Sequence, residues 1–79
     1  MARSLYDIAQ DIVSDYMDRG KSVPHCAEPY VNAMRMLDSI DDNYFEDSGR
    51  DVVLYALSNL STWRGETARR VKTELKSLL

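Results

Sequence analysis

The chain has 79 residues, which is enough for one small domain and excludes a second. It carries 13 acidic and 10 basic residues, a net charge of −3, and its hydrophobic content of 44% excludes an intrinsically disordered chain. The single cysteine, Cys26, excludes the disulfide framework of many small secreted proteins. No apolar run approaches the roughly 18 residues of a membrane span, and the first residues lack the apolar core of a signal peptide. We expect one domain, residues 1–79, in the cytoplasm and away from membranes.

The first predicted helix begins after Ser4 and ends before Gly20. Ser4 and Asp7 have the spacing of an N-terminal capping box, and glycine is the usual residue just past a helix C-terminus. Apolar residues at helical spacing predict the buried stripe Leu5, Ile8, Ala9, Ile12 and Tyr16, widened by Val13 and Met17.

The second predicted helix starts with Pro29 in its first turn, where a missing N–H costs no hydrogen bond. Asp41-Asp42-Asn43 later break the helical pattern with turn-forming residues. We expect residues 41–47 to form a loop, with Tyr44 and Phe45 packed against the core. The expected buried stripe of the helix is Tyr30, Ala33, Met34 and Leu37, with Ile40 as a further candidate.

The third predicted helix follows a second capping box, Ser48 and Asp51. The run Val52–Leu57 is apolar on nearly all sides and continues at Leu60, which favours a central, most buried helix. A β-strand is the alternative for this β-branched run.

The last predicted helix follows Gly65, with Ser61 or Thr62 as expected caps. Its apolar stripe is Ala68, Val71, Leu75 and Leu78. The predicted fold class is therefore all-α, a small four-helix bundle.

Charge is distributed unevenly along the chain. Residues 1–47 contain ten acidic and four basic residues, whereas residues 48–79 contain three acidic and six basic ones. Aspartates four and three residues apart on the first helix form an acidic ridge, which comprises Asp7, Asp11, Asp15 and Asp18. One interpretation of this ridge is a solvated face whose charge is relieved by a basic neighbour such as the last helix. The other is a docking site for a basic partner, or a mimic of a row of phosphates.

Basic residues gather in the last predicted helix. Their helical spacing is typical of a phosphate-contacting surface, formed by Arg64, Arg69, Arg70, Lys72 and Lys76. Cations in a last turn also stabilise a helix C-terminus, and the whole chain is acidic, so nucleic acid is the second choice of partner. Trp63 and Arg64 lie where the last two helices meet, either as a partly buried hinge anchor or as a binding hot spot.

Three candidate chemical sites fail on spacing. His25 and Cys26 are adjacent in sequence, and adjacency does not turn the imidazole toward the sulfur as a nucleophilic pair requires. They are also too few for a structural zinc site, which needs four ligands. The acidic segment 41–47 resembles a calcium loop, but Glu46 stands where that loop needs glycine and Val52 where it needs glutamate.

Several segments resemble a group of small tailed-bacteriophage proteins that have no assigned activity. The matching segments are Pro29–Met34, Leu37–Tyr44, Asp47–Val53 and Leu57–Arg69, within a region from Pro29 to Leu75. The resemblance is most specific around Trp63-Arg64-Gly65. It implies a phage or prophage origin and expression in the cytoplasm of a bacterial host, and it supplies no catalytic or ligand residues.

The sequence thus favours a small phage accessory protein that binds a host or phage protein, for example as an inhibitor of host machinery. The expected binding residues are the acidic ridge, with Trp63 and Arg64 as a second patch. The alternatives are a nucleic-acid-binding regulator that uses Arg69, Arg70, Lys72 and Lys76, and a structural protein that assembles into a homo-oligomer. No enzymatic activity, cofactor or metal is expected.

Overall fold

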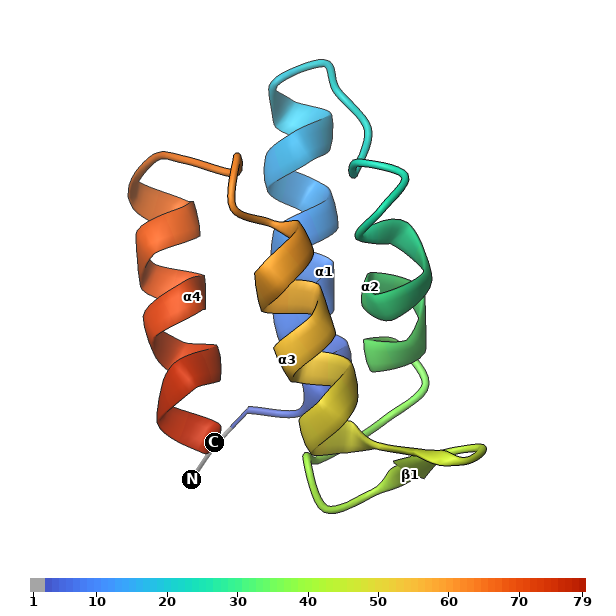
Figure 1. The fold of residues 1–79 in the computed structure, drawn as a ribbon. Helices are drawn as coiled ribbons and strands as arrows, with labels where there is room; N and C mark the ends of the chain where they lie inside the picture. Colours follow the sequence, from blue (N-terminus) through green and yellow to red (C-terminus); the bar gives the residue numbers. More distant parts are fainter. Residues whose placement is uncertain (1–2) are drawn as a thin grey trace.

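The computed structural model describes residues 3–79, in which four helices and one short hairpin follow each other along the chain (Figure 1). In chain order these elements are α1 (Leu5–Asp18), α2 (Glu28–Met34), β1 (Asn43–Tyr44), β2 (Asp47–Ser48), α3 (Gly49–Asn59) and α4 (Glu66–Leu78). The chain is mostly helical, as predicted. The all-α class needs correction, because β1 and β2 pair in antiparallel fashion.

The predicted helix ends are formed by local hydrogen bonds. Ser4 Oγ accepts from the backbone N–H of Asp7 at 3.1 Å, and Ser48 Oγ accepts from that of Asp51 at the same distance. Gly20 follows α1 with a φ of +70°, a conformation that glycine adopts without steric cost. Two helix ends differ from the prediction. α4 begins after Gly65, with no side-chain cap from Ser61 or Thr62. α2 ends at Met34, before Leu37 and Ile40, and in the segment that follows the Asp42 carboxylate accepts from the backbone N–H groups of Asp38 and Ser39.

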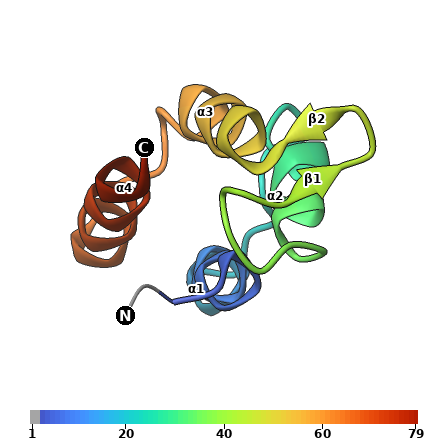
Figure 2. The ribbon, with the colours of Figure 1, turned by 90° about the horizontal axis from the view of Figure 1, so that it is seen from below.

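The helices occupy the corners of a quadrilateral in chain order, so that α1 and α3 lie diagonally opposite (Figure 2). α1 packs against both α2 and α4, and α2 packs against α3. The shared core takes buried side chains from all four helices. No helix within residues 3–79 has the length and apolarity needed to cross a membrane.

α3 does not stand out as the most buried helix, contrary to the prediction: it buries four of its eleven residues, α1 five of its fourteen and α2 three of its seven. α1 buries five side chains, as its predicted stripe required. On α3, Leu54 is 45% exposed and Tyr55 is 48% exposed, although both belong to the apolar run. The reason is position: like every helix of the bundle, α3 stands at a corner, so its outward side stays open to solvent although its residues are apolar.

The predicted loop between the second and third helices contains the hairpin. Asn43 pairs with Ser48 and Tyr44 with Asp47, which leaves a two-residue turn at Phe45 and Glu46. Tyr44 packs against the core as expected. Phe45 does not: it is 87% exposed at the tip and has a φ of +56°, the left-handed region that a bulky side chain rarely adopts.

Candidate functional site

The outer surface between α1 and α2 forms a groove, and one row of α1 lines it. The row contains Tyr6, Gln10, Val13 and Met17, at the spacing that places side chains on one face of a helix. Of these, Tyr6, Val13 and Met17 line the groove. This face lies beside the core stripe of α1. The sequence carried the signal, because the apolar arc of this helix was wider than one core stripe needs.

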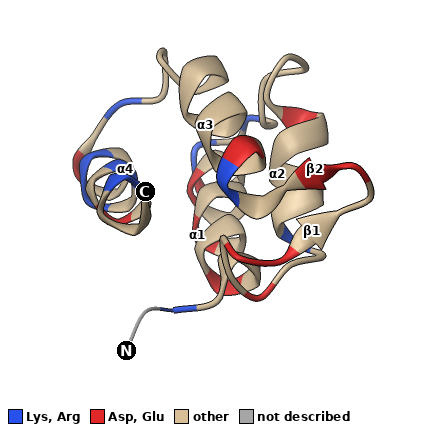
Figure 3. Ribbon diagram, turned by 60° about the horizontal axis from the view of Figure 1, so that its bottom comes forward, with Lys and Arg blue, Asp and Glu red and all other residues tan. Residues whose placement is uncertain are grey.

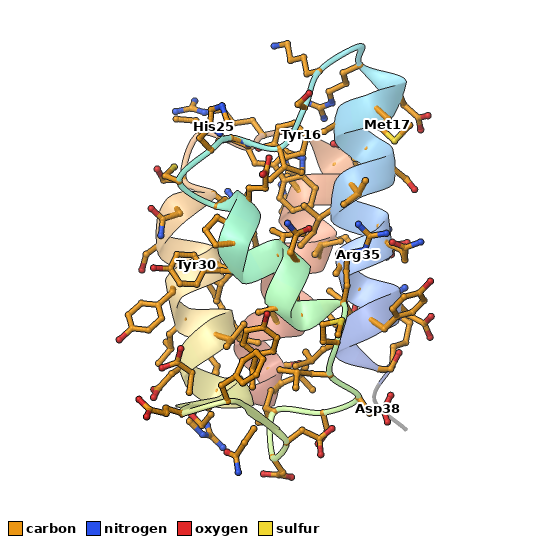
Figure 4. The ribbon with its side chains drawn as sticks, turned by 90° about the vertical axis from the view of Figure 1, so that its right-hand side faces the viewer. Tyr16, Met17, His25, Tyr30, Arg35 and Asp38 are labelled. Carbon is orange, nitrogen blue, oxygen red and sulfur yellow. The ribbon has the colours of Figure 1, made fainter. Side chains whose placement is uncertain are left out.

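Two hollows make up the groove, which faces the viewer in Figure 4. The first hollow is the more enclosed one and has a volume of about 260 Å³, and the second has about 340 Å³ of more open space. Both are lined by Asn32 and Arg35. Figure 4 shows Tyr16 between α1 and the start of α2, with Arg35 reaching from the end of α2 toward α1. The residues that line only the first hollow are Val13, Tyr16, Met17, Lys21, Ser22, Val23, Glu28 and Val31. The second is completed by Tyr6 and Met36.

Large apolar side chains stand exposed along this groove. Met17 is 69% exposed, Met36 is 73% exposed and Tyr6 is 45% exposed. Methionine is flexible and polarisable, so it adapts to an apolar surface brought against it. Exposed apolar side chains gathered around a hollow are typical of a binding surface. We therefore regard the α1–α2 groove as the candidate functional site.

The wall of the first hollow contains a buried phenol. Tyr16 is 7% exposed, and its ring stacks on Trp63 with the centroids 5.8 Å apart. Its hydroxyl is buried and has no hydrogen-bond partner within residues 3–79. The side-chain oxygen Oε1 of Gln10 is also buried without a hydrogen-bond partner in this part of the chain. Burial raises the pKa of Tyr16, so the phenol stays protonated at neutral pH.

The charged residues on the groove wall carry a small positive excess. Lys21, Arg35 and Glu28 all line the first hollow. None of the three forms an ion pair with another residue in the described part of the chain. These side chains are free to pair with charges on a molecule that enters the groove.

The acidic ridge is partly used inside the protein. Asp11 pairs with Arg3 at 2.8 Å and with Arg70 of α4 at 3.6 Å. Asp15 pairs with Arg19 at 3.2 Å and accepts a hydrogen bond from Trp63 Nε1 at 2.7 Å. This arrangement agrees with the interpretation of a face relieved by basic neighbours.

Asp7 and Asp18 are the exposed members of the acidic ridge. Neither forms an ion pair within residues 3–79. The structure thus does not bring the four carboxylates together as one free surface. Asp11, Asp15 and Asp18 line one hollow beside α4, together with Thr67 and Arg70, whereas Asp7 lies outside it.

The second predicted patch, Trp63 and Arg64, is divided between core and surface. Trp63 is 2% exposed, so it is a core residue and not a surface hot spot. The stacking on Tyr16 and the bond to Asp15 explain why it is buried, since both its ring and its N–H find partners inside. Arg64 is exposed.

The basic residues of the last helix are divided as well. Arg70 turns toward α1, where it reaches Asp11. Arg69, Lys72 and Lys76 form no ion pair within residues 3–79. Figure 3 shows the basic positions of α4 apart from the acidic positions of the α2–β1 segment and the hairpin.

The remaining polar candidates, His25 and Cys26, are both exposed in the segment before α2. The Cys26 thiol donates a weak hydrogen bond to the backbone carbonyl of Asn59, with Sγ and O 3.6 Å apart. In the described part of the chain, no group of three or more His, Cys, Asp or Glu residues is placed to hold a metal ion.

Comparison with known protein families, with curated proteins and with solved structures gives no match to this chain.

Proposed function

We propose that this chain acts by binding a protein partner, and that an amphipathic helix of that partner lies in the α1–α2 groove. The observation that carries the proposal is the row of exposed apolar side chains along the two hollows. In this proposal the four helices act as a small bundle that holds the groove in shape.

The length of the groove suits a helix of about three turns. Tyr6 and Met17 are eleven residues apart on α1, which corresponds to about 16 Å along the axis. A partner helix of that length presents apolar side chains at positions i, i+4, i+7 and i+11, the pattern by which helices bind in grooves. Each hollow then takes one or two of them.

The charges along the groove favour carboxylates on the partner helix. Lys21 lines the first hollow and Arg35 lines both hollows. Acidic residues that flank the apolar face of the partner helix would pair with these two cations, which fixes its direction in the groove. Following the resemblance to tailed-phage proteins, we propose that the partner is a host or phage protein in the bacterial cytoplasm.

Photo-crosslinking tests this proposal. A photoreactive amino acid is placed at Met17 or Met36, and in a control at Leu54, an exposed apolar position on α3. We expect the two groove positions to crosslink the same host or phage protein through one peptide with an apolar, acid-flanked helical pattern. Equal crosslinking of that protein at position 54 would contradict the groove as the site.

A charge substitution adds a quantitative measure. Met17→Glu should weaken binding of the crosslinked partner by roughly tenfold, because a carboxylate replaces an apolar contact of about 1.5 kcal/mol. Leu54→Glu is the matched control and should leave binding unchanged. If the crosslinked peptide instead belongs to a second copy of this chain, the solution mass will double and the groove is a self-association surface.

A further inference from the structure

A third hollow lies where the α3–α4 connection meets α4, on a different side from the α1–α2 groove. Its volume is about 370 Å³. Its wall is formed by Trp63, Arg64, Gly65, Ala68, Arg69 and Lys72. Three of these six residues are cations and none is an acid. We call this hollow the cationic pocket.

Lys72 is held in the wall of the cationic pocket by Trp63. Its Nζ donates to the backbone carbonyl of Trp63 at 2.7 Å and lies 6.0 Å from the centre of the indole ring. An ammonium carries three N–H groups, so this one bond leaves donors for a ligand. Because the carbonyl belongs to the buried Trp63, the ammonium is positioned before any ligand arrives.

The cations of this pocket have no carboxylate partner. Arg64, Arg69 and Lys72 form no ion pair within residues 3–79, whereas Arg3, Arg19 and Arg70 all do. Burial, together with the charges of Lys76 and Arg64, lowers the pKa of Lys72. The positive end of the α4 dipole adds to the same potential. A positive site of this kind attracts a multiply charged anion.

We propose that the cationic pocket binds phosphate groups. Guanidinium groups match the geometry of phosphate oxygens with two parallel hydrogen bonds, and a lysine ammonium adds a point charge. The hollow is open to solvent on one side, and its volume of about 370 Å³ leaves room for a diphosphate.

Two sources of phosphate fit this chemistry: a small diphosphate-bearing molecule and the backbone of single-stranded nucleic acid. Lys76 separates them. It lies one turn beyond Lys72 on the same face of α4 and does not line the pocket, so only a ligand that continues along the helix reaches it.

Trp63 makes the test local, because it is the only tryptophan and lines the pocket. Its fluorescence is recorded while sodium pyrophosphate, or in a second arm a short oligothymidylate, is added at constant ionic strength. We expect a saturable change with at least one probe. Pyrophosphate alone points to a small ligand, and an oligothymidylate response that weakens in Lys76→Gln points to nucleic acid.

The double substitution Arg64→Gln and Arg69→Gln leaves the Lys72–Trp63 contact in place and should weaken binding by roughly tenfold or more, since two charge-assisted contacts are lost. Arg50→Gln, at an exposed cation of α3 outside both sites, is the control and should bind like the original chain. Absence of a saturable change with both probes, or equal binding by the double variant, would overturn the proposal. Neither result bears on the groove, which is tested separately by crosslinking.

Discussion

At the scale of single residues, Phe45 is the most unusual position. It combines a left-handed backbone with the largest exposed fraction among the large hydrophobic residues of residues 3–79. As the first residue of a two-residue hairpin turn, it occupies a place where glycine is favoured, because a side chain there meets its own backbone. Its ring touches Tyr44 edge to face, with the centroids 4.7 Å apart. The hairpin therefore stores strain that the exposed ring only partly offsets.

Replacing Phe45 by glycine should raise the free energy of unfolding by about 1 kcal/mol, because relief of the strain exceeds the loss of the contact with Tyr44. The measurement is urea denaturation followed by circular dichroism. Leu54→Gly is the control: it also removes an exposed apolar side chain, but from a helix interior, and should lower stability by about 1 kcal/mol. A loss of stability in Phe45→Gly would mean that the aromatic contact outweighs the strain.

At the scale of elements, the start of α3 is fixed by a close approach of two backbones. Gly49 is buried, and its N–H donates to the carbonyl of Asp42 at 2.7 Å. A Cβ at this position would lie 2.8 Å from the carbonyl oxygen of Ser39 and 2.9 Å from backbone atoms of Ile40. None of these backbone atoms can move without shifting the segment that leads into the hairpin. The packing of α3 thus depends on a residue with no side chain.

Gly49→Ala should therefore lower the free energy of unfolding by about 1 to 3 kcal/mol, the usual cost of overpacking. Thermal and urea unfolding measure this change. Gly20→Ala provides a comparison, since Gly20 has a φ of +70° and no atom within 4 Å of the added Cβ. Gly20→Ala should lower the free energy of unfolding by only about 1 kcal/mol, the cost of placing a residue with a Cβ in the left-handed conformation. Equal costs for the two substitutions would show that the segment at Ser39 and Ile40 yields easily.

At the scale of the whole molecule, a charged cluster ties the N-terminal segment to α1 and α4. Arg3 donates to both carboxylate oxygens of Glu74 and also to Asp11. The two bonds to Glu74 join residues 71 positions apart in the sequence. The hydrogen bonds from Arg3 are the main cause that lowers the pKa of Glu74 in the folded chain.

The lowered pKa of Glu74 predicts a pH dependence of stability. A carboxyl group with a lower pKa in the folded state stabilises the fold above its unfolded pKa, here about 4.5. This contribution, on the order of 1 kcal/mol for a partly exposed pair, is lost as the pH falls below 4.5 through the folded pKa. At pH 7, Glu74→Gln should have a free energy of unfolding lower than that of the original chain by about this amount. Between pH 5 and about pH 3, the stability of the variant should decrease less than that of the original chain. A pH profile unchanged by this substitution would show that Glu74 gains nothing from Arg3.

The charge of the whole molecule is also arranged by the fold. Residues 38–51 carry six acidic residues and one basic residue, and they lie together around the hairpin (Figure 3). The free cations Arg64, Arg69 and Lys72 lie by the cationic pocket, near the start of α4. The unequal charge of the two halves of the sequence therefore appears in the fold as an acidic region and a basic region. The acidic ridge contributes less to this separation than its sequence suggests, because Asp11 and Asp15 have partners inside the protein.

The sequence by itself determined the helices and most of their ends. Ser4, Ser48 and Gly20 act through hydrogen bonds or φ values within one turn, so their effect can be recognised without knowledge of any distant residue. The core stripe of α1 was also predictable, since helical periodicity places those side chains on one face.

Only the tertiary structure decided which apolar and charged residues are buried, paired or free. Val13 and Met17 continue the stripe of α1, yet they line a groove, because α2 covers one side of that helix and leaves the other open. Trp63 is buried because Tyr16 and Asp15, 47 and 48 positions earlier, meet it across the core. Such contacts depend on how the helices pack, which local periodicity does not specify.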